Sequence, residues 1–354
     1  MEAQGELLKA AGLIPSSFDM VQGQLDLMAA GVLGYYDPKT KALVVRGGTE
    51  VTPFLREILA HELTHALDDQ HVSLDRPELE HVTDGRDFAF LALVEGSAKR
   101  VENEYVATLD AQEQQQLQQE MLEMGFEQMQ TMSDIPMVLP RLQMAPYDYG
   151  EPFAEALVAK GGTAALDAAM RELPTTSEQI LDESKYDARE GALAVDRPPA
   201  DGEVTQEGTL GQLMTGFLLH GASDGGLGGL GDLGDLGEGL EGLDPAVLQQ
   251  LLDLLLGDGT EPGGLDGLGD LGGLGDLGAT GFPPIATVAG WGGDHYVVYR
   301  TAGQRCLRVD WRMDTPAAQA QLDDELRSWA AGDPAVQVTA PSADLLRATR
   351  CSAA

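Results

Sequence analysis

The stretch that decides the interpretation of this chain is His61-Glu62-Leu63-Thr64-His65. It has the H-E-x-x-H pattern, in which two histidines one helical turn apart can bind a single zinc ion beside a glutamate that can act as a base. Thr52 followed by Pro53 is a helix start signal, with Thr52 as the N-cap. A helix is therefore predicted from Pro53 to about His71, with the whole motif inside it.

The helical period places the two histidines on one face of this predicted helix. Counting about 100° per residue from His61, His65 falls at about 40° and Glu62 at about 100°. The imidazoles can thus converge on one ion, while Glu62 can reach a water beside it. Four leucines fall on the opposite side and predict a buried stripe: Leu55, Leu59, Leu63 and Leu67.

A third protein ligand is needed for a catalytic zinc site, and two residues compete for this role. His71 has the right spacing for an extended H-E-x-x-H-x-x-G-x-x-H motif, but Asp68 stands at the glycine position. On a continuous helix His71 would also point away from His65. Glu95 lies in a second predicted helix, over 87–105, beside small residues that permit close helix approach. We favour Glu95, with His71 as the alternative.

The rest of the chain predicts an α+β fold that is mainly helical. Further helices are expected over 111–132, 152–160, 163–172, 209–219 and 316–330, and the prolines at 136, 140 and 146 are expected to break the chain. A short strand is expected at 43–45, and a β-hairpin is expected from 295–300 and 306–311. The chain is thus expected to end in a hairpin plus helix.

Charge excludes one class of partner. The 354 residues include 58 acidic and 22 basic ones, giving a formal net charge of −36. Nucleic-acid binding needs clustered Lys and Arg, so no nucleic-acid partner is expected. No apolar run reaches the about 18 residues of a membrane span, and the start of the chain lacks the basic and apolar regions of a signal peptide.

Residues 224–281 form a low-complexity block with 20 glycines, 17 leucines and no Lys, Arg or aromatic residue. The composition predicts a flexible acidic insertion, with a short helix at 246–256. A stack of extended glycine helices is a second interpretation, and a calcium-binding nonapeptide array fits less well. The block divides the chain into an N-terminal segment (1–50), a helical region (51–223), the insertion (224–281) and a C-terminal hairpin and helix (282–354).

Several of these segments resemble one family. The run from His61 to His71, followed by Leu93-Val94-Glu95-Gly96, resembles zincin metallopeptidases of the gluzincin type, and more narrowly bacterial proteins with HELTHALQDQH and LVEGDA segments. The likeness continues in GYYDPK at 34–39, in the helical stretches from 146 to 181 and in GWGGD at 290–294. It implies a zincin-like fold, one Zn²⁺ held by His61, His65 and Glu95, and a secreted or cell-envelope protein.

The sequence departs from that pattern at positions near the site. Asp68 replaces the usual Gln, and Lys99 stands where thermolysin-like enzymes have an Asp that orients a histidine. A donor to a developing oxyanion is also needed. The candidates for transition-state or supporting roles are His295, Tyr296, Tyr299, Asp294 and Asp68.

These observations predict a zinc-dependent metallopeptidase in which Glu62 is the general base and a peptide or protein is the substrate. The strand region at 36–45 is expected to pair with an extended substrate. Two alternatives stay open: an inactive zincin-fold scaffold or binding protein, and a metal hydrolase of non-peptide amide bonds. Cys306 and Cys351 can form one disulfide or remain thiols.

Overall fold

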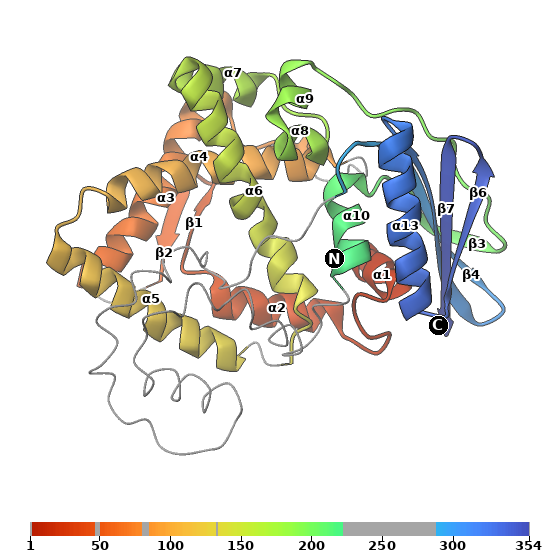
Figure 1. Cartoon of the computed structure of the whole chain (residues 1–354). Coiled ribbons are helices and arrows are strands. Elements are labelled where there is room, and N and C mark those ends of the chain that lie inside the picture. Colours follow the sequence, from red (N-terminus) through yellow and green to blue (C-terminus); the bar gives the residue numbers. More distant parts are fainter. Residues whose placement is uncertain (1, 47–49, 80–84, 132–133, 222–287, 354) are drawn as a thin grey trace, which may run out of the picture.

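The computed structural model describes residues 2–46, 50–79, 85–131, 134–221 and 288–353. The predicted insertion at 224–281, with its short helix, lies outside these residues. The protein is α+β and mainly helical, as the sequence predicts, with a small two-stranded sheet and a larger five-stranded one. Figure 1 shows α3, α4 and the small sheet on one side of the molecule, and the larger sheet with α13 on the other.

The helices and strands have the following bounds. The helices are α1 (Glu2–Ala11), α2 (Met20–Gly31), α3 (Pro53–Val72), α4 (Arg86–Val106), α5 (Ala111–Thr131), α6 (Val138–Gly161), α7 (Thr163–Arg171), α8 (Ser177–Leu181), α9 (Glu183–Asp187), α10 (Gly211–His220) and α13 (Pro316–Gly332). The strands are β1 (Gly34–Asp37), β2 (Ala42–Val45), β3 (Glu203–Gly208), β4 (Trp291–Thr301), β5 (Gln304–Met313), β6 (Val336–Ser342) and β7 (Leu345–Ala353).

Two helices begin at the predicted residues because their first turns are capped. The Thr52 hydroxyl accepts a hydrogen bond from the Leu55 N–H, and Thr315 accepts one from Ala318, satisfying donors that a helix start leaves free. In each case the next residue is a proline, which has no backbone N–H to satisfy. The predictions for α3, with its cap at Thr52, and for α13 are therefore confirmed.

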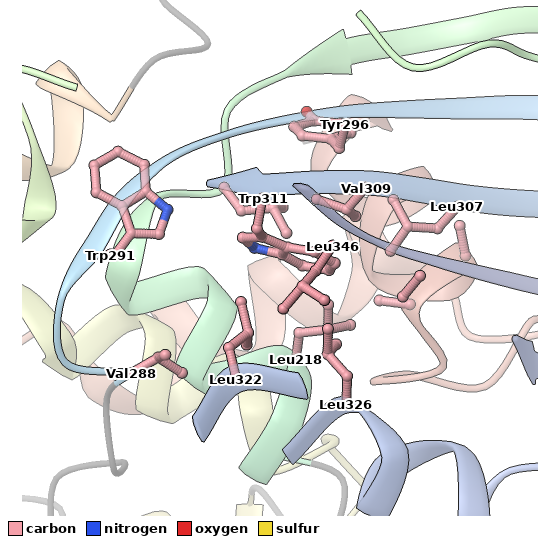
Figure 2. Packing of buried hydrophobic residues seen from close by; sticks show 14 of the residues in the cluster. Leu218, Val288, Trp291, Tyr296, Leu307, Val309, Trp311, Leu322, Leu326 and Leu346 are labelled. Atoms are coloured by element: carbon pink, nitrogen blue, oxygen red, sulfur yellow. The ribbon is translucent and has the colours of Figure 1, made fainter. Parts of the chain in front are cut away.

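The C-terminal sheet is antiparallel, in the order β3-β4-β5-β7-β6. Its β4–β5 hairpin confirms the predicted one. The described chain does not end in a helix as predicted, because β6 and β7 follow α13 and extend the sheet. Trp291, Trp311 and Leu346 pack against leucines of α10 and α13 on one face (Figure 2). Cys306 and Cys351, opposite each other on β5 and β7, form a disulfide.

The N-terminal segment does not stand apart from the C-terminal sheet. Ala10 and Ala11 of α1 lie in the same core as Trp311. The Glu6 carboxylate also accepts hydrogen bonds from Arg300 and Arg305. Helix α1 therefore covers part of the sheet that the other end of the chain forms.

Two of the three prolines expected to break the chain, Pro140 and Pro146, lie within one long helix, whereas Pro136 lies just before it, as predicted. Helix α6 runs from Val138 to Gly161 and contains Pro146 and Pro152, while Pro140 lies in its first turn. A proline in the first turn costs little because the N–H groups there are unpaired anyway. The interior prolines remove backbone donors, but α6 shares a buried core with α4 through Phe153, which supports the helix.

Helices α4 and α6 cross unusually closely through a pair of glycines. A Cβ added to Gly96 would lie 2.1 Å from the carbonyl oxygen of Gly150, and one added to Gly150 would lie 1.9 Å from that of Ala92. Both distances are far below any real carbon contact, so only glycine fits at either position. This crossing fixes the position of Glu95, the residue before Gly96.

Candidate metal centre

The leucine stripe of α3 is not buried, contrary to the sequence prediction: two of its leucines are exposed, and Leu55 and Leu59 are half-buried. Leu63 is 57% exposed and Leu67 53%, whereas His61, Glu62 and His65 are buried. The amphipathic rule fails here because the inward face of α3 carries polar side chains that find charged partners on α4. The helical phase was correct: the histidines and the leucines lie on opposite faces.

His61, His65 and Glu95 converge on one point. The Nε2 atoms of His61 and His65 are 3.1 Å apart, and Glu95 Oε2 lies 3.1 Å from the first and 3.3 Å from the second. Ligands at about 2.05 Å from a tetrahedral zinc ion are roughly 3.3 Å apart. The three atoms thus form a triangle of the size that a tetrahedral zinc ion requires.

Glu95 and His61 stabilise each other's charged form even without a metal ion. Burial raises the pKa of Glu95, but hydrogen bonds from both histidines outweigh it and lower the pKa to about 2. Burial lowers the pKa of His61, but its bonds to Glu102 and Glu95 dominate and raise the pKa to about 9. The negative charge of Glu95 is therefore balanced by a positive charge on His61.

Glu102 orients His61. Its Oε2 lies 3.0 Å from His61 Nδ1, so the ring donates there and Nε2 faces Glu95. Lys99 donates to the other Glu102 oxygen, and Glu57 also hydrogen-bonds to this carboxylate. Burial and the charge of Glu102 raise the pKa of Glu57 to about 8, so Glu57 carries a proton near neutral pH.

Lys99, one of the positions where the sequence departs from the family pattern, has a role in this arrangement. The side chain does not orient a histidine itself, but it holds the carboxylate that does. Glu102 lies seven residues after Glu95, on the same face of α4. That spacing is a signal from which the sequence could have predicted it.

Glu62 lies beside the three ligand candidates without joining them. Its carboxylate accepts a hydrogen bond from the Tyr36 N–H of β1, and burial raises its pKa. A Cβ added to Gly34 would lie 2.8 Å from Ile58 and 3.3 Å from Glu62, so this glycine lets β1 approach α3 closely. The Tyr36 hydroxyl and the Lys41 ammonium anchor the hairpin on Asp69 at 2.7 and 2.5 Å.

Tyr147 of α6 completes the surroundings, and sequence reasoning did not assign it to the site. Its hydroxyl hydrogen-bonds to Glu95, and its ring stacks on His61, with centroids 5.8 Å apart and planes inclined by 26°. Burial and the neighbouring charge of Glu95 raise the pKa of the phenol, so it stays protonated. Its position depends on the α4–α6 crossing, which no local pattern reveals.

The remaining sequence candidates lie elsewhere or make other contacts. His71 lies near the end of α3, is exposed and is outside the convergent group. Asp68 is hydrogen-bonded to Ser97. The candidates of β4 lie on the opposite side of the molecule from α3 (Figure 1).

The candidates of β4 have structural partners. Asp294 accepts hydrogen bonds from the N–H groups of Leu210 and Gly211, at the start of α10, and from the Trp291 indole. Tyr296 accepts a bond from Gln206, and His295 lies 3.4 Å from the carbonyl oxygen of Val195. Tyr299 packs in a small core on the other face of the sheet. These contacts hold the sheet and α10 together.

Across the part of the chain that the structure describes, no helix combines the length and apolarity needed to cross a membrane. Comparisons with protein-family models, curated proteins and solved structures found no match to this chain.

Proposed function

We propose that the protein is a zinc-dependent metallopeptidase. The observation that carries this proposal is the triangle of His61 Nε2, His65 Nε2 and Glu95 Oε2, with sides of 3.1 to 3.3 Å, next to a buried glutamate. Two imidazoles and one carboxylate are a ligand set that catalytic zinc sites use. A zinc ion held there would polarise a carbonyl group and lower the pKa of a water molecule toward about 7.

Glu62 would move the protons of the reaction. Its carboxylate takes a proton from the attacking water and later delivers it to the nitrogen of the leaving amine. Burial raises its pKa, which makes it a stronger base than an exposed glutamate. The Tyr36 N–H holds the carboxylate beside the ligand triangle and keeps it from turning into solvent.

The free edge of β1 would align the substrate. In the β1–β2 ladder, the Arg46 N–H donates to the Leu33 carbonyl at 2.7 Å. Hydrogen-bonded pairs alternate along an antiparallel ladder, so Gly34 and Tyr36 direct their backbone groups away from β2. The bond from the Tyr36 N–H to Glu62 fits this alternation. An extended peptide can pair with such an edge next to the base.

A substitution of the base tests the proposal. The wild-type protein with zinc should cleave an unstructured protein such as casein, and a chelator should abolish the cleavage. Glu62→Gln should bind zinc as the wild type does but lose cleavage by at least about 10²-fold. Glu172→Gln is the matched control, because that exposed carboxylate pairs with Arg189 and not with the ligand triangle. Full activity of Glu62→Gln, or no cleavage by the zinc-loaded wild type, would refute the proposal.

A further inference from the structure

The β1–β2 hairpin carries apolar side chains on the face that points away from α3. Burial alternates along β2, where Leu43 and Val45 are half-buried and Val44 is exposed. On β1, Tyr35 is 49% exposed, and it lies directly opposite Val44, which is 43% exposed. The solvent-facing side of an antiparallel pair ordinarily carries polar residues. The Tyr35–Val44 pair is therefore an apolar surface that the fold does not bury.

This pair lies beside the proposed general base. A Cβ added to Gly34 would lie only 3.3 Å from the Cγ atom of Glu62, so the backbone of β1 touches the base at this residue. Tyr35 is the next residue along the strand. Because successive side chains of a strand point to opposite faces, the Tyr35 ring points away from α3 while its backbone stays next to Glu62.

The hairpin is anchored on α3 in the protein alone. The Tyr36 hydroxyl donates to Asp69 at 2.7 Å, and the Lys41 ammonium donates to the same carboxylate at 2.5 Å. The side chain of Asp69 is only 2% exposed, so these bonds are shielded from water on the side of the carboxylate. The position of Tyr35 relative to Glu62 is therefore set before a substrate binds.

The hydrogen-bond pattern of the hairpin determines which part of a substrate would meet Tyr35. The bond from Arg46 to Leu33 makes these two residues a hydrogen-bonded pair. Tyr35 and Val44 are the next such pair, so the backbone groups of Tyr35 point toward β2 and those of Gly34 point to the free edge.

A peptide that pairs antiparallel with this edge would bond to Gly34, and its residue opposite Tyr35 would form a non-hydrogen-bonded pair. The Cα atoms of such a pair are about 4.5 Å apart, and the two side chains lie on the same face in close contact. The substrate side chain at this place would therefore lie against the Tyr35 ring.

We propose that Tyr35 is a specificity-determining residue, which selects extended peptides with an apolar side chain at the residue opposite it. That side chain packs on one edge of the ring, while Val44 supports the other. A charged or small polar side chain gains little from this surface. The inference rests on the proposed peptidase function, and it names the substrate class: peptides with an apolar residue near the cleaved bond.

The test compares matched peptides. A peptide that the zinc-loaded wild type cleaves is first identified by mass spectrometry of a casein digest. Each residue within about three positions of the cleaved bond is then replaced in turn by Phe, Ser and Asp, and kcat/KM is measured. We expect one position at which the wild type prefers Phe to Ser and Asp by about fivefold.

Two variants examine the cause of this preference. Tyr35→Thr removes the ring but keeps a residue type that strands favour, and it should lose the preference at that position alone. Tyr35→Lys should turn the preference toward Asp, because opposite charges pair across strands. Such a gain cannot arise from misfolding. Leu193→Thr is the matched control, since Leu193 is 45% exposed and lies beside β4; it should rank the peptides as the wild type does.

The results that would overturn the inference differ from failure of the proposed function. If the zinc-loaded wild type cleaves no peptide, the peptidase proposal itself fails. If the wild type cleaves peptides but shows no Phe preference near the cleaved bond, the role of Tyr35 is refuted. The same holds if Tyr35→Thr and Tyr35→Lys rank the peptides as the wild type does.

Discussion

The glycine crossing of α4 and α6 predicts that one added methyl group will damage the metal site. In Gly96→Ala the new Cβ would lie 2.1 Å from the Gly150 carbonyl oxygen, whereas ordinary contacts begin at 3.4 Å. The helices must therefore separate by about 1.3 Å at this point. Metal–ligand distances tolerate only about 0.2 Å, so the neighbouring Glu95 would leave its ligand position.

We expect Gly96→Ala to lower zinc affinity by at least about tenfold and to destabilise the protein by about 1–3 kcal/mol, as overpacked core sites do. Chelator competition measures the first effect, and thermal unfolding of the zinc-free protein measures the second. Gly125→Ala in α5 is the control, because its Cβ would meet nothing within 4 Å. It should leave zinc affinity unchanged and stability equal or slightly higher. Wild-type zinc affinity and stability in Gly96→Ala would contradict the proposed crossing.

Three further predictions concern pH, the support of His61 and the disulfide. Burial opposes the charge on His61, but its bonds to Glu102 and Glu95 raise its pKa to about 9, so zinc must displace a proton from this ring below that pH. The apparent zinc affinity should therefore rise about tenfold per pH unit from pH 6 to 8. A zinc affinity that does not change with pH would contradict this. Glu102→Gln should weaken zinc binding about 10–100-fold in chelator competition, because Nδ1 of His61 loses its negatively charged acceptor. Replacing Cys306 and Cys351, 45 residues apart, with serine should cost about 2–5 kcal/mol in denaturant unfolding without changing zinc affinity, and unchanged stability would show that the bridge contributes nothing.

The elements that the sequence predicted well are those set by local signals. Helix α3 follows from the cap at Thr52 and Pro53, and the β4–β5 hairpin follows from two apolar runs joined by a short turn. The phase of the histidines also follows from the helical period. Each of these depends on residues close together in the chain.

The predictions that failed depend on contacts between distant segments. The leucine stripe of α3 is not buried, because the helix buries its polar face against Glu95 and Glu102, which lie more than 30 residues from His61. The prolines of α6 do not end it, because α4 supports the helix from outside. Strand β6 was missed because most of its residues are exposed, which leaves a weak apolar alternation.

The candidate site divides in the same way. His61, Glu62 and His65 follow from one motif, and Glu95 follows from a carboxylate among small residues in an apolar helix. Tyr147 could not be assigned, because its place beside Glu95 exists only through the crossing of two helices. The acidic net charge argues against a nucleic-acid partner, but it carries no information about the buried carboxylates that organise the site.

The central claim is that His61, His65 and Glu95 hold one zinc ion. Metal analysis of the purified wild type, Glu95→Ala and His71→Ala after exposure to zinc and removal of the excess tests it most directly. We predict one zinc per chain in the wild type and in His71→Ala, and a large loss in Glu95→Ala. Full zinc content in Glu95→Ala together with loss in His71→Ala would contradict the account.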